Sequence, residues 1–240
     1  MSVADNYKEI VKIMKTCSDT QNLYEVFTDF VKMMAYNISF AVDMTTKDER
    51  IKEYETIAKK YTKEQLEGCA QVLALVTSIL EQQREDVFGR IYMELGFGDK
   101  LKAQEFTPTG ISSIMAMLSL DKQSVEGVIK KEGFVSIEDS SCGGGSTIIQ
   151  AVEELTKIGV NPQSQILVFA NDLDFMAVAM CYVQLSLLGI PALIKQQDTL
   201  TLMIFSVWYT PFFILGNWYG RLRLRDAFKK MMEVMEEIEE

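Results

Sequence analysis

The alternation of short apolar runs with helix-like stretches between residues 134 and 195 restricts the possible fold more than any other feature of the sequence. The predicted strands are Phe134 to Ile137, Ile166 to Ala170 and Pro191 to Lys195. The stretches between them, Thr147 to Ile158 and Asp174 to Leu188, are each followed by a glycine, which is typical of a helix C-terminus. Connections this short favour parallel strands joined by right-handed crossovers. We therefore expect an α/β fold with a doubly wound, mostly parallel sheet.

The first third of the chain follows a different pattern, with almost no glycine or proline before residue 95. Apolar residues recur at steps of three and four, as one buried helical face requires: Val26, Phe27, Phe30, Val31, Met34, Ile38 and Val42. Thr62 to Gln65 has the spacing of a capping box and opens a helix on which Leu66, Ala70, Leu73 and Leu80 share one side. The sequence thus predicts an N-terminal helical bundle over residues 1–95. A second domain over residues 96–240 would end in an acidic helix from Arg225 to Glu240.

Composition excludes several kinds of chemistry. The chain has no histidine, which rules out Ser-His-Asp systems, imidazole bases and every zinc site that needs a histidine ligand. Lys and Arg number 24 against 34 Asp and Glu, a net charge of −10, so nucleic-acid binding through bulk positive charge is excluded as well. The four cysteines stand far apart, which indicates neither a disulfide framework nor a metal site.

Two uncharged stretches are long enough to cross a bilayer, Phe175 to Ile194 and Thr199 to Gly220. Both are interrupted, the first by Gly189 and Pro191 and the second by Pro211, Gly216 and Asn217. We interpret each as a buried helix or strand followed by a turn. No signal peptide is evident at the start of the chain, and a reducing cytoplasm is the expected location.

In a sheet of the predicted kind, ligands bind beyond the carboxyl ends of the strands, so the loops that follow each strand are the candidate site. The first loop runs from Asp139 to Ser146 and contains Gly143, Gly144 and Gly145, where the backbone can approach a ligand closely. The G-x-G-x-x-G fingerprint of dinucleotide-binding proteins would require a further glycine at position 148, where this sequence has isoleucine. This difference argues against a nicotinamide cofactor.

Acidic residues in the other loops suit a nucleoside. Asp172 is well placed to accept both ribose hydroxyls, whereas we interpret Asp174 as the N-cap of the next helix. Asp198 either accepts the exocyclic amine of an adenine or caps a turn. Upstream, Thr107 precedes Pro108, and a helix starting there would offer free amides to a carboxylate. Together these segments describe a site for S-adenosylmethionine.

The same segments carry a resemblance to a known family. In chain order they are Asp86-Val87-Phe88-Gly89-Arg90-Ile91-Tyr92, Phe106-Thr107-Pro108, Cys142-Gly143-Gly144-Gly145, Asp172 with Asp174, Tyr182 to Pro191, and Asp198-Thr199-Leu200. The segment Tyr182 to Pro191 looks especially like the small phage and plasmid members of the class I S-adenosylmethionine-dependent N6-adenine DNA methyltransferases. The other segments resemble that family's D-x-x-G-x-x-Y, F-x-P and C-G-S-G motifs, its D-x-D or E-x-N motif, and its G-D-T-L motif. The likeness is greatest to the modification subunits of type I restriction systems and to the small phage and plasmid members.

The resemblance implies a cofactor site made by Phe106, Thr107, Asp139, Cys142, Gly143, Gly145, Asp172 and Asp198. In it, Asp172 would bind the ribose, Asp139 and the backbone at Gly143 and Gly145 the methionine part, Thr107 its carboxylate and Asp198 the adenine. The sequence departs from the family at Ala103, where a glycine is common, at Glu105, which replaces an aromatic residue, and at Ser140, which replaces a proline.

A larger departure concerns the catalytic loop. The family uses N-P-P-F or D-P-P-Y after the fourth strand, because oxygens must accept the two hydrogens of the N6 amine while an aromatic ring stacks on the flipped base. The nearest counterpart is Tyr209-Thr210-Pro211-Phe212, which follows the apolar run Leu200 to Trp208, a candidate fourth strand. Phe212 could stack on a base, but Tyr209 stands where a small acceptor is expected.

The resemblance and the departures from it leave two alternative functions for this chain. One is methyl transfer from S-adenosylmethionine to adenine N6 in DNA, without a metal. The alternative is a catalytically inactive protein of the same fold that binds a protein partner, for example a host defence or modification complex. A basic segment with Arg221, Arg223 and Arg225 followed by Lys229 and Lys230 is a possible DNA contact, although we interpret it as a solvated face.

Overall fold

The computed structural model describes residues 2–19, 21–97 and 122–239, and the side chains of the last helix are described to Ala227 and at Lys230. The described residues up to 97 form the helices α1 (Val3–Cys17), α2 (Leu23–Val42), α3 (Lys47–Ala58), α4 (Lys63–Gln82) and α5 (Val87–Glu94). The predicted capping box is present, because the Thr62 hydroxyl accepts from the Gln65 amide and the Thr62 amide donates to Gln65 Oε1. In α4 the buried face is made by Cys69, Val72, Val76 and Ile79, and Ala70 of the predicted face is exposed.

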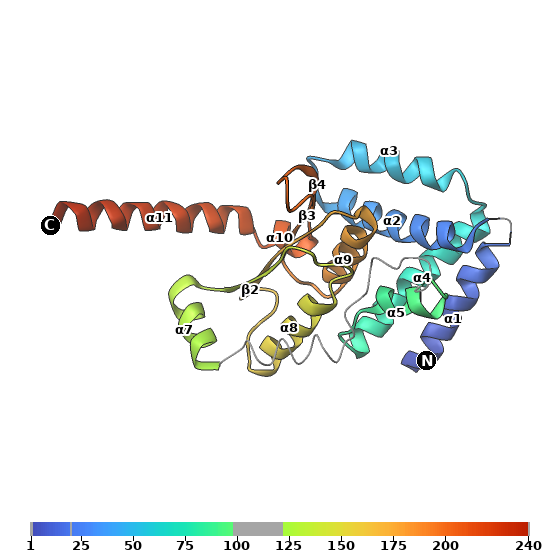
Figure 1. The fold of residues 1–240 in the computed structure, drawn as a ribbon, viewed down its shortest axis with the longest axis horizontal. Coiled ribbons are helices and arrows are strands. Elements are labelled where there is room, and N and C mark those ends of the chain that lie inside the picture. Colours follow the sequence, from blue (N-terminus) through green and yellow to red (C-terminus); the bar gives the residue numbers. More distant parts are fainter. Residues whose placement is uncertain (1, 20, 98–121, 240) are drawn as a thin grey trace.

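The second part alternates strands and helices as the sequence predicts. In chain order it contains α7 (Lys122–Glu132), β1 (Val135–Asp139), α8 (Ser146–Lys157), β2 (Ile166–Asp172), α9 (Phe175–Leu187), β3 (Ala192–Gln197), β4 (Ile204–Tyr209), α10 (Pro211–Leu215) and α11 (Trp218–Glu239). Helix α11 starts seven residues before the predicted Arg225 and projects away from the rest of the chain (Figure 1). Among the described helices, none combines the length and the apolar character needed to cross a bilayer.

The sheet has the order β1-β2-β3-β4, with β1, β2 and β3 parallel and β4 antiparallel to β3. The mostly parallel character agrees with the prediction. The described strands, however, follow one another without the reversal of order that defines a doubly wound sheet. The predicted fourth strand is also corrected: it begins at Ile204 rather than Leu200 and runs antiparallel.

The two faces of the sheet are covered by different helices. Strand residues such as Val168, Ile194 and Trp208 belong to the large core cluster with α8 and α9, and that same cluster continues without interruption into α1, α2, α4 and α5. On the other face a small cluster joins Phe134, Leu167, Phe213 and Trp218. Alternate residues of β2 therefore face different helical layers, as the period of two in a strand requires.

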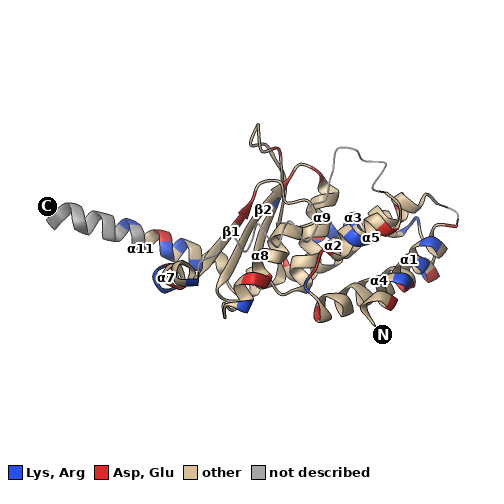
Figure 2. Ribbon diagram, turned by 60° about the horizontal axis from the view of Figure 1, so that its bottom comes forward, with Lys and Arg blue, Asp and Glu red and all other residues tan. Residues whose placement is uncertain are grey.

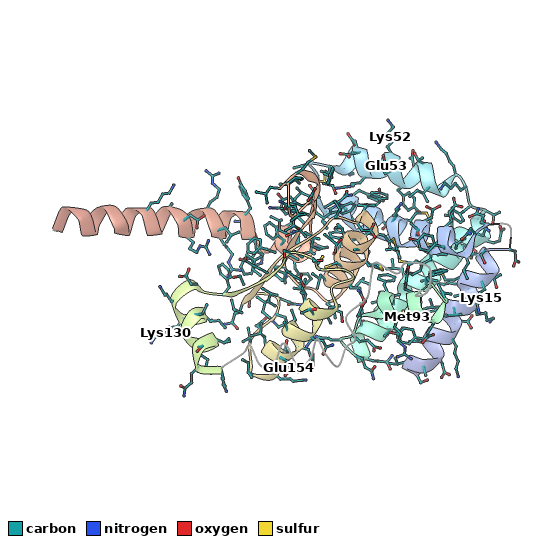
Figure 3. All side chains as sticks on the ribbon, in the orientation of Figure 1. Lys15, Lys52, Glu53, Met93, Lys130 and Glu154 are labelled. Atoms are coloured by element: carbon teal, nitrogen blue, oxygen red, sulfur yellow. The ribbon has the colours of Figure 1, made fainter. Side chains whose placement is uncertain are left out.

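Trp208 lies where the helical part meets the sheet. Its ring centroid is 5.7 Å from that of Tyr36 in α2 and 5.1 Å from that of Tyr182 in α9, and the guanidinium of Arg50 in α3 sits 3.5 Å from the centroid of the indole. Arg50 Nη2 also donates to the Val207 carbonyl over 3.3 Å. Figure 3 shows the side chains filling the space between these layers, while Lys15, Lys52 and Lys130 lie on the outer surface.

Candidate functional site

The loops after β1, β2 and β3 are tied together at one edge of the sheet. Asn171 at the end of β2 donates its side-chain amide to the Ser140 carbonyl and to the Thr199 hydroxyl, each over 3.1 Å. The Thr199 hydroxyl in turn donates to the Ser140 carbonyl at 3.0 Å. Because carboxyl ends of parallel strands meet at one edge, the three predicted loops converge, and these hydrogen bonds fix their relative positions.

Asp172 and the glycine bend face each other across this edge. The Gly143 amide donates to Asp172 Oδ2 at 2.9 Å, and the Asp174 amide donates to Asp172 Oδ1 at 3.0 Å. The Asp172 side chain is half-buried rather than enclosed. Each carboxylate oxygen accepts one amide and keeps a second lone pair, so the carboxylate can still accept hydroxyl groups from a ligand.

The three consecutive glycines have different surroundings. A Cβ on Gly144 would lie 3.2 Å from Asp86 Oδ1, and one on Gly145 would lie 3.1 Å from Cys181 Sγ, so the inner side of the bend is closely packed. Gly143, with φ of +52°, has no atom of the described residues within 4 Å of the equivalent position. The bend is therefore filled on its protein side and open at Gly143, next to Asp172.

Two carboxylates, Asp139 and Asp172, make this edge electronegative. Asp139 accepts a hydrogen bond from the Ser141 amide at 3.0 Å. Burial raises the pKa of the Asp139 carboxyl, the Ser141 bond lowers it, and the negative charge of Asp172 raises it further. Within the described residues neither carboxylate takes part in a salt bridge. The arrangement suits a cationic ligand.

Other predicted residues are occupied by local structure. Asp174 caps α9 by accepting from the Met176 amide at 2.9 Å, as interpreted from the sequence. Asp198 Oδ1 accepts from the amides of Leu200 and Thr201, which is the turn-capping alternative, and bonds from Thr201 and Leu200 lower the pKa of its carboxyl.

Cys142 contributes its backbone to the site. Its amide donates to the Asn171 carbonyl at 3.0 Å, and its thiol is buried. Phe106 and Thr107 lie outside the described residues. Among the residues that the structure describes, no group of three or more metal-ligating side chains lies close enough together to hold a metal ion.

The predicted catalytic tetrad is separated from these loops. Tyr209 pairs with Leu193 near the start of β3, whereas Gln196, near the end of β3, pairs with Asp172. The Thr210 hydroxyl donates to the Ile190 carbonyl and accepts from the Ala192 amide, both at the amino end of β3. Pro211 and Phe212 begin α10 on that same side. The antiparallel course of β4 thus carries Tyr209, Thr210, Pro211 and Phe212 to the opposite edge from Asp172.

The basic segment also lies apart from the loops. Arg221 stacks 3.6 Å from the Trp218 ring and donates to the Ser164 carbonyl, and Arg225 pairs with Asp226. Lysines and arginines of α7 and the first part of α11 gather at the end of the molecule away from α1 and α4 (Figure 2). Arg221 therefore links the start of α11 to the segment before β2, whereas the ion pair of Arg225 lies within α11.

Sequence reasoning gave no role to the two side chains behind the glycine bend, Asp86 and Gln184. Both are buried, and Gln184 donates to the Gly144 carbonyl at 2.7 Å. Both lie in segments that carry the family resemblance, Asp86 in the D-x-x-G-x-x-Y stretch and Gln184 between Tyr182 and Pro191.

Comparison with known proteins gives one family match. A family model described as N-6 DNA Methylase matches residues 83–213, more than half of the 240-residue chain. Its matched range includes β1 to β4 and all the loops described above. No curated protein matches the sequence.

Two solved structures are also similar. One is a Listeria monocytogenes protein described as a class I S-adenosylmethionine-dependent methyltransferase, with 16% sequence identity and a TM-score of 0.42, matched over 79% of this chain and 52% of its own. The other is the methyltransferase subunit of a type I restriction-modification system from Streptococcus thermophilus, with 15% identity and a TM-score of 0.41, matched over 83% and 59%. The chain spans between half and three fifths of the length of these proteins.

Proposed function

The chain belongs to the N-6 DNA methylase family, and from this premise we propose that it binds S-adenosyl-L-methionine at the carboxyl edge of its sheet and transfers the methyl group to adenine N6 in DNA. S-adenosyl-L-methionine is the cofactor of this family. When bound, it supplies an electrophilic methyl group on a positively charged sulfur.

The observation that carries the proposal is the contact of Asp172 with the open glycine bend at Gly143. A carboxylate beside an unobstructed backbone position offers acceptors for two ribose hydroxyls while the bend accommodates the amino-acid part of the cofactor. Asp139 and Asp172 together favour a ligand with positive charge, which the sulfonium and ammonium groups provide. The residues present therefore fit the cofactor.

Roles for the other predicted residues follow from the same arrangement. We propose that Asp139 and the backbone at Cys142, Gly143 and Gly145 hold the methionine part. We also propose that Asp198 accepts a hydrogen bond from the adenine amine through the carboxylate lone pairs that its turn does not use. Phe106 and Thr107 stay predictions from the sequence.

Two measurements on the wild-type protein test this function. Isothermal titration calorimetry with S-adenosylmethionine and S-adenosylhomocysteine is expected to show 1:1 binding. Incubation with labelled cofactor and mixed-sequence DNA is expected to place label on adenine N6, where the N–CH3 bond forms, the S–CH3 bond breaks and the amine loses a proton. Binding without transfer would remove the catalytic part of the proposal, and absence of binding would remove all of it.

Cofactor affinity is expected to fall as the pH is lowered through the range where Asp139 protonates. Burial raises the pKa of this carboxyl in the ligand-free protein, and a nearby cation favours the ionised form. Protonation therefore removes an attraction, and binding of the cofactor releases protons within that range. Calorimetry at a series of pH values measures both effects.

Asp139→Asn is the control for this pH dependence. It should weaken binding at neutral pH by about tenfold, the loss of one charge-assisted contact, and it should flatten the profile. A wild-type profile that is already flat would contradict the placement of Asp139 beside the cation.

A further inference from the structure

Gln184 is a fully buried amide that meets four backbone and side-chain groups from two other parts of the chain. Its Oε1 accepts from the amides of Val87 and Phe88 in α5, at 2.7 and 3.3 Å. Its Nε2 donates to Asp86 Oδ1 at 3.0 Å and to the Gly144 carbonyl at 2.7 Å. The side chain has no exposed surface, and all its hydrogen-bonding groups are used.

Asp86 completes the connection on the same inner side of the bend. It is the N-cap of α5, with its Oδ1 accepting from the Gly89 amide at 2.9 Å. Its carboxylate also fills the space where a Cβ on Gly89 or on Gly144 would stand. Burial raises the pKa of the Asp86 carboxyl, because the ionised form loses its contact with water, and the hydrogen bonds from Gly89 and Gln184 lower it in part. A glycine at position 89 is therefore needed to admit this side chain, and a side chain at position 144 would make a tight contact with it.

The hydrogen bond to Gly144 has a directional consequence. Because the peptide unit is planar, holding the Gly144 carbonyl toward α9 fixes the orientation of the peptide that joins Gly144 to Gly145. The same bend has its Gly143 amide directed to Asp172 and its Gly145 amide directed to the Cys142 carbonyl. A run of three glycines has unusually large conformational freedom, so such fixed contacts are required to keep one conformation.

We propose that Gln184 and Asp86 are positioning residues for the cofactor site, which hold the inner side of the glycine bend so that its outer side at Gly143 stays open for the methionine part of S-adenosylmethionine. This inference rests on the proposed function. In this arrangement the α5 segment, which belongs to the helical part of the chain, sets the shape of the binding loop through the side chain of Gln184. The benefit is preorganisation, since a loop already in its bound shape loses less entropy on binding.

The experiment compares Gln184→Met with Gln150→Met. Methionine is similar in size to glutamine but makes no equivalent hydrogen bonds. Gln150 is the matched control because it too is buried and bonds to the adjacent segment, at the Arg84 carbonyl over 3.4 Å, without touching the bend. We expect Gln184→Met to weaken binding of S-adenosylmethionine by about tenfold or more, with Gln150→Met within about twofold of wild type.

Hydrogen exchange in the ligand-free variants supplies a second readout that does not depend on the cofactor. Each protein is measured at the same number of degrees below its own melting temperature. The amides from Gly143 to Ile149 should exchange faster in Gln184→Met than in wild type, and their exchange rates should be unchanged in Gln150→Met. If wild type binds no cofactor, the proposed function fails, and the exchange comparison still decides the positioning role. Equal exchange in the two variants would overturn it.

Gln184→Glu keeps the test available if Gln184→Met does not fold. In this variant an ionised carboxylate at position 184 cannot donate to the Gly144 carbonyl, whereas a protonated carboxyl has a single O–H donor. Relative to wild type at each pH, we expect loop protection to be lost at neutral pH and partly regained on acidification. Asp86 faces this group directly, and Asp139 and Asp172 lie across the bend. These three carboxyl groups also titrate in wild type, so comparing the two proteins at each pH separates their effect on exchange from that of the new carboxyl group. Protection that does not change with pH in Gln184→Glu would contradict the proposal.

Discussion

Replacing Asp172 with asparagine is expected to weaken the binding of S-adenosylmethionine by about a hundredfold, the equivalent of losing one strong charge-assisted contact with the ribose. The carboxylate supplies negative charge beside the cation and two acceptors of the same kind, whereas an amide supplies one acceptor and one donor. The donor would also face an amide, either that of Gly143 or that of Asp174, where the carboxylate now accepts. Calorimetry at neutral pH measures the loss.

The control for this variant is Asp43→Asn. Asp43 also caps a local turn, accepting from the amide and hydroxyl of Thr45 and from the hydroxyl of Thr46, but it lies at the end of α2. Both variants are expected to lose about 1–2 kcal/mol of stability, and only Asp172→Asn should lose cofactor. Unchanged affinity in Asp172→Asn would exclude this edge of the sheet as the binding site.

Trp208→Ala is expected to lower the free energy of unfolding by about 4 kcal/mol, a large part of the roughly 5–15 kcal/mol typical of a domain. The indole is 1% exposed and packs against Tyr36, Phe175 and Tyr182. Its removal leaves a cavity and also takes away the ring on which the Arg50 guanidinium stacks. Urea unfolding followed by far-ultraviolet circular dichroism measures the change.

Tyr219→Ala serves as the comparison for Trp208→Ala. Tyr219 is an aromatic residue of α11 that is 63% exposed, so its truncation should change stability by no more than about 0.5 kcal/mol. A similar loss in both variants would mean that Trp208 is not the centre of the packing between helices and sheet.

Local sequence patterns were enough to predict most helices and strands. Periodic apolar residues located α2, and the alternation between residues 134 and 195 located β1 to β3 with their two helices. The same patterns predicted that Asp172 lies close to the glycine bend, because the carboxyl ends of parallel strands share one edge, and the Gly143 amide does donate to Asp172. These predictions depend on short-range signals and on one general rule of topology.

The direction of β4 was not predicted, although the sequence contained the relevant signal. Only Asp198 to Met203 separates β3 from β4, and a parallel connection needs about a dozen residues or more. The antiparallel course of β4 is the reason that Tyr209 to Phe212 lie at the opposite edge from Asp172.

The contact of Gln184 with Gly144 could not have been predicted in the same way. The residues are 40 positions apart, and a buried amide leaves no periodic trace.

One hydrophobic cluster extends through both compositional halves of the chain, from Tyr7 in α1 to Trp208 in β4. The change of pattern near residue 95 therefore marks a change in secondary structure and not a gap in the packing. We therefore expect that loosening the first helices removes support from the sheet, and that the two halves unfold together in one cooperative transition.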